Sequence, residues 1–150
     1  IQMKYFTQIS ILTLLILILS CKKEETLDTS DFLINKNGWY SYEAKRTDLI
    51  DGTGFTTNSP YIIIGEYGSG FRLSNDGVCF ISYADGSSPI EEPTLTRSWE
   101  LVNKNQIEFK SETAPSQDIV ATIVKINNDS LWIEYKQSGD LWEYKLKKIE

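Results

Sequence analysis

The chain has no histidine among its 150 residues. Histidine is the commonest general base in enzymes and the commonest side-chain ligand of transition metals. Its absence excludes serine–histidine and cysteine–histidine catalytic pairs, and it excludes zinc sites that combine cysteine with histidine. We therefore expect no catalytic residue, no metal site and no cofactor, and we interpret the protein as not being an enzyme.

Cysteine is nearly as scarce, with Cys21 and Cys79 as the two in the chain. Cys79 lies in the apolar run Val78-Cys79-Phe80, which favours a buried, unreactive thiol over a nucleophile. Cys21 stands before the part of the chain that we expect to fold. That part therefore has a single thiol and no disulfide of its own.

Basic residues are in the minority, with 15 Lys and Arg against 21 Asp and Glu and a net charge of −6. Without residues 1–20, which hold Lys4 and no acidic residue, the net charge is −7. A chain without a basic patch binds nucleic acid phosphates poorly, so we expect no nucleic-acid partner.

Long apolar runs are also missing. Residues 9–19 form an apolar stretch of eleven residues that includes one serine and one threonine, whereas a membrane-spanning helix needs ~20 apolar residues. The stretch follows Lys4 and leads to Ser20, a small residue directly before Cys21. A basic start, a short apolar region and a small residue predict a cleaved secretory signal over residues 1–20, rather than an uncut anchor.

The residues at the predicted cut resemble the lipobox of bacterial lipoproteins, which has an aliphatic residue, a small residue and then cysteine. Here the lipobox is Ile18, Leu19 and Ser20, followed by Cys21. The resemblance implies that Cys21 becomes the lipidated first residue and carries acyl chains such as palmitate. Each buried lipid methylene contributes ~0.8 kcal/mol, so several chains together give a stable membrane anchor.

Cys21 is followed by Lys22, Lys23, Glu24 and Glu25. This run resembles the signal that sends Bacteroidota lipoproteins to the outer face of the outer membrane. The resemblance implies a lipid-anchored outer-membrane protein that faces the cell exterior. The alternative is an ordinary charged, solvated tether, with the protein facing the periplasm.

After residues 21–32, which we expect to be a flexible tether, the chain is a series of short strands separated by turns. Ser30 or Asp31 can cap one helical turn that ends at Leu33. Turn residues dominate 47–58, which predicts a loop, and Asn75-Asp76-Gly77 predicts a tight hairpin turn. The expected strands are 38–46, 60–67, 70–73, 77–83, 97–102, 106–110, 118–126, 131–136 and 141–148.

Apolar and polar residues alternate along these strands. Trp99 and Leu101 share one face, for example, while Ser98 and Glu100 share the other. This pattern is typical of antiparallel sheets with one buried face. Consecutive hairpin-linked strands predict an all-β domain over residues 33–150, an antiparallel up-and-down β-barrel of about eight strands, because closure removes exposed edges. A β-sandwich is the alternative.

The same residues resemble the lipocalin-like lipoproteins of Bacteroidota over roughly residues 33–149. The pattern combines an early tryptophan strand, a phenylalanine before an Asn/Asp-Gly turn, and a later Trp-x-Leu strand. It then has a short hairpin and ends in strands rich in Ile, Leu and Tyr. The matching residues are Trp39, Phe71 with Asn75-Asp76-Gly77, Trp99-Glu100-Leu101, Ile107-Glu108-Phe109, Ile123 to Ile126, Leu131-Trp132-Ile133 and Tyr144-Lys145-Leu146.

The resemblance implies a lipocalin-like barrel that binds a small apolar ligand or serves as a non-catalytic binding module. The residues expected to form the wall of the binding cavity are Trp99, Leu101, Phe109, Ile133 and Tyr135. An eight-stranded barrel can hold one small ligand, or its own side chains can fill it. In the second case the same five residues make a solid core.

The alternative function is a surface interaction protein with such a solid core. Trp132, with the opposite parity to Ile133, would then lie on the outer wall. Together with Tyr40, Tyr42, Tyr61 and Tyr67 it would form an exposed aromatic patch that contacts a glycan or a protein.

Two other short motifs resemble sequences with a chemical function. Glu91-Glu92 is a carboxylate pair of the kind used in glycoside hydrolysis, but it lies between prolines in a predicted loop and is typical of a solvated charge pair. Asp129-Ser130-Leu131 resembles the O-glycosylation sequon of exported Bacteroidota proteins, although a turn that enters a strand uses the same residues.

Overall fold

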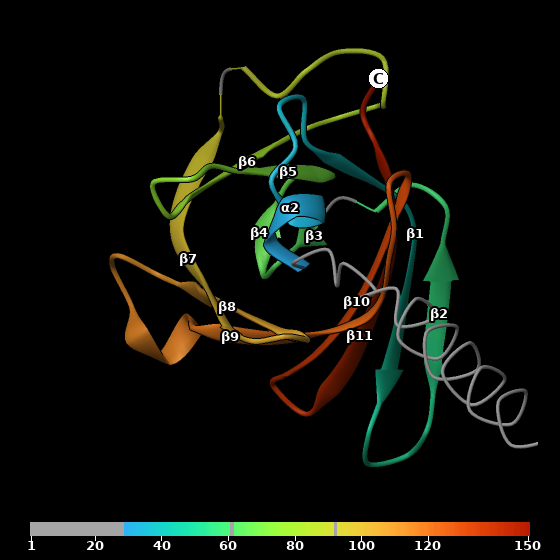
Figure 1. Cartoon of the computed structure of the whole chain (residues 1–150). Coiled ribbons are helices and arrows are strands. Elements are labelled where there is room, and N and C mark those ends of the chain that lie inside the picture. The colour runs from blue at the N-terminus through green and yellow to red at the C-terminus, as the bar shows by residue number, and fades with distance from the viewer. Residues whose placement is uncertain (1–28, 61, 92) are drawn as a thin grey trace, which may run out of the picture.

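The fold is a closed antiparallel up-and-down β-barrel, seen in a computed structural model that describes residues 29–60, 62–91 and 93–150 (Figure 1). Each barrel strand pairs with the next along the chain, and the last strand pairs with the first. The strands are β1 (Trp39–Asp48), β5 (Gly70–Leu73), β6 (Val78–Ser82), β7 (Leu95–Asn103), β8 (Gln106–Lys110), β9 (Ile119–Ile126), β10 (Ser130–Gln137) and β11 (Asp140–Lys148). The predicted barrel is confirmed, and a β-sandwich is excluded because β1 and β11 close the ring.

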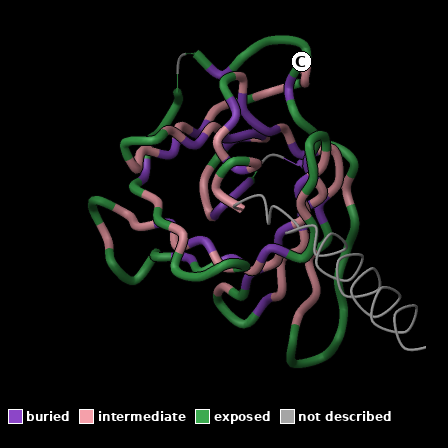
Figure 2. The backbone as a smooth tube through the Cα atoms, in the orientation of Figure 1, coloured by how far each residue is buried: buried purple, intermediate pink, exposed green. Residues whose placement is uncertain are grey.

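The strands follow the alternation in the sequence. On β10, Leu131, Ile133 and Tyr135 are buried, while the residues between them are not. The Asn75-Asp76-Gly77 turn joins β5 to β6 as predicted, with Gly77 in the left-handed region at φ 82°. Figure 2 shows buried segments recurring around the ring, while the turns outside it are exposed.

A short helix covers one end of the barrel. Helix α2 (Thr29–Leu33) buries Leu33 completely, and the Trp39 indole Nε1 donates a hydrogen bond to the Leu33 carbonyl at 3.0 Å. The Thr29 hydroxyl donates to the Lys104 carbonyl, in the β7–β8 turn, at 2.9 Å. The helical turn predicted through Leu33 is therefore present. It includes the last residues of the segment that the sequence assigns to the tether.

A small hairpin covers the opposite end. It consists of β3 (Ile62–Ile63) and β4 (Glu66–Tyr67), which reverse at Ile64 and Gly65 with φ values of 53° and 72°. The prediction of one strand over 60–67 is wrong, because the chain turns back so that Ile63 and Ile64 are fully buried inside the barrel. A β-branched residue at positive φ is rare, so the isoleucine run favours an extended strand on local preference alone.

An additional strand, β2 (Gly54–Thr57), lies outside the barrel and pairs with β1. At the start of β1, Trp39 and Tyr40 pair with β5. Further along the same edge of β1, residues 44–47 pair with β2. The sequence predicts a loop over 47–58, but β1 continues to Asp48, and Gly52 makes the hairpin turn at φ 74°. Strand β2 thus pairs with the part of the β1 edge that β5 does not reach.

Gly54 should control whether β2 stays attached. A Cβ at this position would lie 2.0 Å from the Arg46 carbonyl oxygen, which is backbone and cannot move independently. We expect Gly54→Ala to detach β2 and leave the barrel folded, so amide hydrogen exchange over residues 54–57 should accelerate by at least about tenfold. Thr56→Ala, an exposed change on the same strand, is the control. Unchanged exchange in Gly54→Ala would contradict this account of β2.

The helical segments that the structure describes are α2 and a single 3₁₀ turn, η1 (Pro115–Gln117), between β8 and β9. Among the described residues, no helix has the length and apolar character needed to span a membrane.

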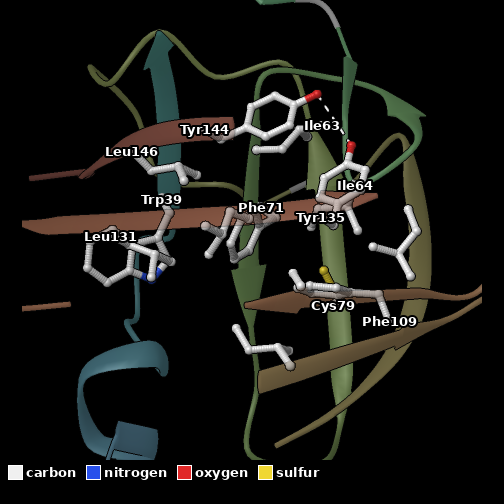
Figure 3. Packing of buried hydrophobic residues seen from close by; sticks show 14 of the residues in the cluster. Trp39, Ile63, Ile64, Phe71, Cys79, Phe109, Leu131, Tyr135, Tyr144 and Leu146 are labelled. Carbon is white, nitrogen blue, oxygen red and sulfur yellow. Dashed lines mark hydrogen bonds between the residues drawn. The ribbon is translucent and has the colours of Figure 1, made fainter. Parts of the chain in front are cut away.

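The core fills the barrel from the α2 end to the β3–β4 hairpin (Figure 3). Trp39 lies next to α2, and the rings of Phe71 and Phe109 meet edge to face with centroids 5.9 Å apart. The Cys79 side chain is fully buried among them, and burial raises the pKa of its thiol. The burial of Cys79 that its apolar flanks predict is therefore confirmed.

Candidate binding sites

The five residues expected to line a ligand cavity lie together in the core. Phe109, Ile133 and Tyr135 are 0%, 1% and 3% exposed, and Trp99 and Leu101 pack against the same cluster from the α2 end. A void large enough for water leaves accessible surface on its walls, and these three buried side chains have almost none. In this arrangement the five residues contact other side chains, and a ligand would enter among them only if they moved.

An aromatic stack leads from the core to the rim of the barrel at the end where the β3–β4 hairpin lies. Tyr135 and Tyr144 are stacked with ring centroids 5.8 Å apart, and Trp142 continues the stack 6.0 Å from Tyr144. Phe55 on β2 meets Trp142 edge to face at 6.3 Å. The Tyr135 hydroxyl donates to the Tyr144 hydroxyl at 3.4 Å (Figure 3). The same Tyr135 hydroxyl accepts the Gly65 N–H at 3.2 Å, which ties the stack to the β3–β4 hairpin.

This stack should make the fold sensitive to alkali. Burial raises the pKa of Tyr135 and Tyr144 above the ordinary value of 10.0. A raised folded-state pKa contributes stability that is complete below pH 10.0 and is lost as the pH rises above it, because the unfolded chain ionises first. We expect the urea midpoint to be lower at pH about 11 than at pH about 8, and Tyr144→Phe to make that difference smaller. Tyr83→Phe, at an exposed tyrosine, should leave the difference unchanged; an identical difference in Tyr144→Phe would contradict the prediction.

A buried ion pair joins the β3–β4 hairpin to the barrel wall. Arg97 on β7 is 2% exposed, and its Nε donates to Glu66 Oε1 on β4 at 3.1 Å. Its Nη2 donates to the same carboxylate oxygen, and Nη1 donates to the Gln117 carbonyl at 2.9 Å. The arginine is thus satisfied from two sides, which a buried charge requires.

An apolar hollow lies at the rim of the barrel, where Phe55 of β2 meets Trp142 of β11. We call it the mouth hollow. Its volume is about 200 Å³, and its lining is mainly apolar. Phe55 is 50% exposed and Ile62 is 37% exposed, so both side chains present apolar surface to solvent. The mouth hollow is lined by Ala44, Phe55, Thr57, Ser59, Pro60, Ile62 and Trp142.

Charged neighbours hold the Trp142 ring in place at this rim. The Arg46 guanidinium lies over that ring, 5.9 Å from its centroid, and Arg46 Nε donates to Asp140 Oδ2 at 2.7 Å. The alternation of apolar and polar residues on the last strand predicts that Trp142 shares the inward face with Tyr144. The sequence therefore indicates the Trp142 side of the mouth hollow. Phe55 falls in the predicted loop, so the sequence assigns it no face.

A second hollow lies on the outer side of β1, and we call it the outer groove. It has a volume of about 310 Å³ and is open to solvent. Two of the predicted surface tyrosines, Tyr40 and Tyr42, line it together with Tyr83, which the sequence analysis did not single out. Its lining is Tyr40, Ser41, Tyr42, Asn58, Ser59, Pro60, Ser69, Tyr83, Ala84 and Asp85.

The remaining members of the predicted aromatic patch do not join this groove. Trp132 lies two strands away on β10, with the amino groups of Lys125 and Lys145 at 4.6 Å and 5.3 Å from the centre of its ring. Its indole N–H is buried and has no hydrogen-bond partner among the described residues. Tyr67 is 71% exposed but does not line the groove, and Tyr61 lies outside the described residues.

Several predicted features lie outside the described residues. These are the signal over residues 1–20 with its lipobox, Cys21, the charged run at residues 22–25, and Glu92 of the carboxylate pair. Glu91 is exposed. Within the described ranges, no three Asp, Glu or Cys side chains gather as a metal site would require.

No protein-family model, no curated protein and no solved structure matches this chain.

Proposed function

We propose that this protein is a non-catalytic binding module whose mouth hollow holds the apolar part of a small ligand. The observation that carries the proposal is the group formed by Phe55, Ile62 and Trp142, which presents apolar surface at the barrel rim. A concave apolar site with a few polar groups beside it is the usual form of a small-molecule site. Thr57 and Ser59 are the polar groups in this lining.

The size of the mouth hollow limits what it holds. Ligand sites for drug-sized molecules measure roughly 300–1,000 Å³, and this one measures about 200 Å³. It fits one ring or a short alkyl end, while the rest of the ligand stays at the rim near the Arg46–Asp140 pair. Burial of apolar surface contributes ~25 cal/mol per Å², so a group of this size supports weak to moderate affinity.

The proposal extends to the place of the protein in the cell. Following the resemblance to lipocalin-like lipoproteins of Bacteroidota, Cys21 anchors the chain in the outer membrane through lipid, and the barrel faces the exterior. Thr29, the first described residue, is at the α2 end, whereas the mouth hollow is at the opposite end of β1. A tether from Cys21 would therefore leave the mouth directed away from the membrane.

Ligand binding is tested by native mass spectrometry of the protein purified from its own host, followed by NMR titration with indole as a defined probe. We expect a small apolar molecule to co-purify, and indole to shift the amide signals of Phe55 and Trp142. Phe55→Ala should weaken indole binding by about tenfold or more, since it removes one wall of the hollow. Tyr67→Ala, at an exposed tyrosine outside the hollow, should not. Indole shifts confined to other surfaces would overturn the proposal.

Anchoring is tested separately with Cys21→Ala in the host. We expect this variant to stay unlipidated and to leave the membrane fraction, whereas the unchanged protein stays in it. Added protease should digest the unchanged protein on intact cells. Protection from the protease would support the periplasm-facing alternative, and membrane retention of Cys21→Ala would contradict the lipid anchor.

A further inference from the structure

The outer groove continues beyond its first hollow. A second hollow of about 370 Å³ adjoins it along the β6–β7 loop, and the two share Ser69, Tyr83, Ala84 and Asp85 in their lining. Together they form an open trough that runs from Pro60, beside β1, to Pro89. A trough that is open to solvent suits a chain-like ligand, which can continue past its ends, better than a small enclosed molecule.

The walls of the trough are held by specific contacts. The Ser69 hydroxyl donates to the Ala84 carbonyl at 2.7 Å and accepts the Ala84 N–H at 2.8 Å, which joins the residue before β5 to the loop after β6. Gly86, at φ 88°, lies against the ring of Tyr40, where a Cβ would stand 2.6 Å from the ring carbon Cε1. A side chain at residue 86 would therefore displace the Tyr40 ring, so this glycine shapes the groove.

The chemistry of the lining is both aromatic and hydroxylated. Tyr40 and Tyr42 come from β1, and Tyr83, which is 59% exposed, faces the same hollow from the loop. Tyrosine combines a flat apolar body with a polar tip. Asn58 and Ser59 add neutral hydrogen-bonding groups, and Asp85 adds a carboxylate. A purely apolar ligand would leave these polar groups without partners.

Sugar rings match this combination of groups. A pyranose presents C–H groups on its face, which pack on an aromatic ring, and hydroxyls at its rim, which bond to side chains like these.

The charge of the groove distinguishes between neutral and acidic sugars as its ligand. Hydrogen bonds from the Ser87 hydroxyl and N–H hold the pKa of Asp85 below its ordinary value, so this carboxylate is ionised at neutral pH. The chain as a whole is acidic, at −6, although the Lys147 amino group lies 4.9 Å from the centre of the Tyr42 ring.

We propose that the outer groove binds a neutral glycan chain, with sugar rings packed on Tyr42 and Tyr83. This site is separate from the mouth hollow, although Ser59 and Pro60 lie between the two and line both. It gives the protein a means to contact a surface polysaccharide independently of any small ligand at the mouth.

The test uses the full chain against an array of defined neutral and acidic oligosaccharides, with isothermal titration calorimetry on the neutral oligosaccharide that binds most strongly. We expect Tyr83→Ala to weaken that binding by about tenfold, and Tyr83→Phe, which keeps the ring, to weaken it much less. Tyr42→Ala should also weaken it, with thermal unfolding to confirm that each variant is folded. Tyr83 is exposed on a loop, so its variants keep the test valid even if Tyr42→Ala does not fold.

Two controls separate this site from its neighbours. Tyr67→Ala removes an exposed tyrosine outside the trough, and Phe55→Ala removes a wall of the mouth hollow; neither should change glycan affinity. Indole binding should in turn survive Tyr83→Ala, so either proposal can fail without the other. The proposal is overturned if no neutral oligosaccharide binds or if only acidic ones bind. It is also overturned if the affinity is unchanged in both Tyr83→Ala and Tyr42→Ala.

Discussion

Replacing Phe109 with alanine should lower the free energy of unfolding by about 3–5 kcal/mol, which is the usual loss for a fully buried phenylalanine. Phe109 is 0% exposed and meets Phe71 edge to face inside the barrel. Its removal takes away both apolar burial and the contacts of the surrounding side chains. Small domains have total stabilities of roughly 5–15 kcal/mol, so this single change removes a large share. Urea unfolding followed by tryptophan fluorescence measures it.

Val120→Ala is the matched control, because Val120 lies on the neighbouring strand β9 but is 47% exposed. We expect it to change stability by less than about 0.5 kcal/mol. The pair also separates a solid core from a ligand cavity. If Phe109 formed the wall of an open cavity, its replacement would cost well under 3 kcal/mol, since it would already lack contacts on one side.

Glu66→Ala should have the next largest effect. It would leave the Arg97 guanidinium buried at 2% exposure without its carboxylate partner. Losing one member of a buried pair costs about 3–5 kcal/mol, and we expect a value near 3 because Glu66 itself is 23% exposed. The β3–β4 hairpin should also loosen, so amide exchange at residues 62–67 should rise by more than global destabilisation explains.

The double variant Glu66→Leu with Arg97→Met provides the comparison. Well-packed apolar replacements for a buried ion pair are often neutral or stabilising, so this variant should recover most of the stability lost in Glu66→Ala. Recovery would show that the loss comes from an orphaned charge. If the double variant is less stable than Glu66→Ala, the hydrogen bond from Arg97 to the Gln117 carbonyl is the larger contribution.

The barrel could be predicted from the sequence because its strands alternate strictly. Leu131, Ile133 and Tyr135 show the period of two, and the Asp76-Gly77 turn sets the pairing of β5 with β6. Closure follows from the physics of edges, since consecutive hairpins leave two unpaired edges that can satisfy each other. These are local signals or simple consequences of them.

The candidate sites depend on contacts that the sequence does not encode locally. Ile64 adopts a left-handed conformation because its burial inside the barrel outweighs its preference for an extended backbone. Arg97 shares the inward parity of Trp99, but its partner Glu66 is 31 residues away on a hairpin predicted to be a plain strand. The sequence predicts a loop at Phe55 because glycine and threonine surround it. In each case a distant part of the chain decides the role of the residue.

The pairing of β1 with β11 has a consequence for the order of events during synthesis. Trp39 pairs with Lys148, so the first barrel strand finds this neighbour only when the last strand exists. Contacts this distant in sequence slow folding, and until they form β1 keeps an open edge that can pair with another chain. The barrel therefore cannot close before β11 has been made, and up to that point every stage of synthesis leaves two strand edges that no neighbour covers.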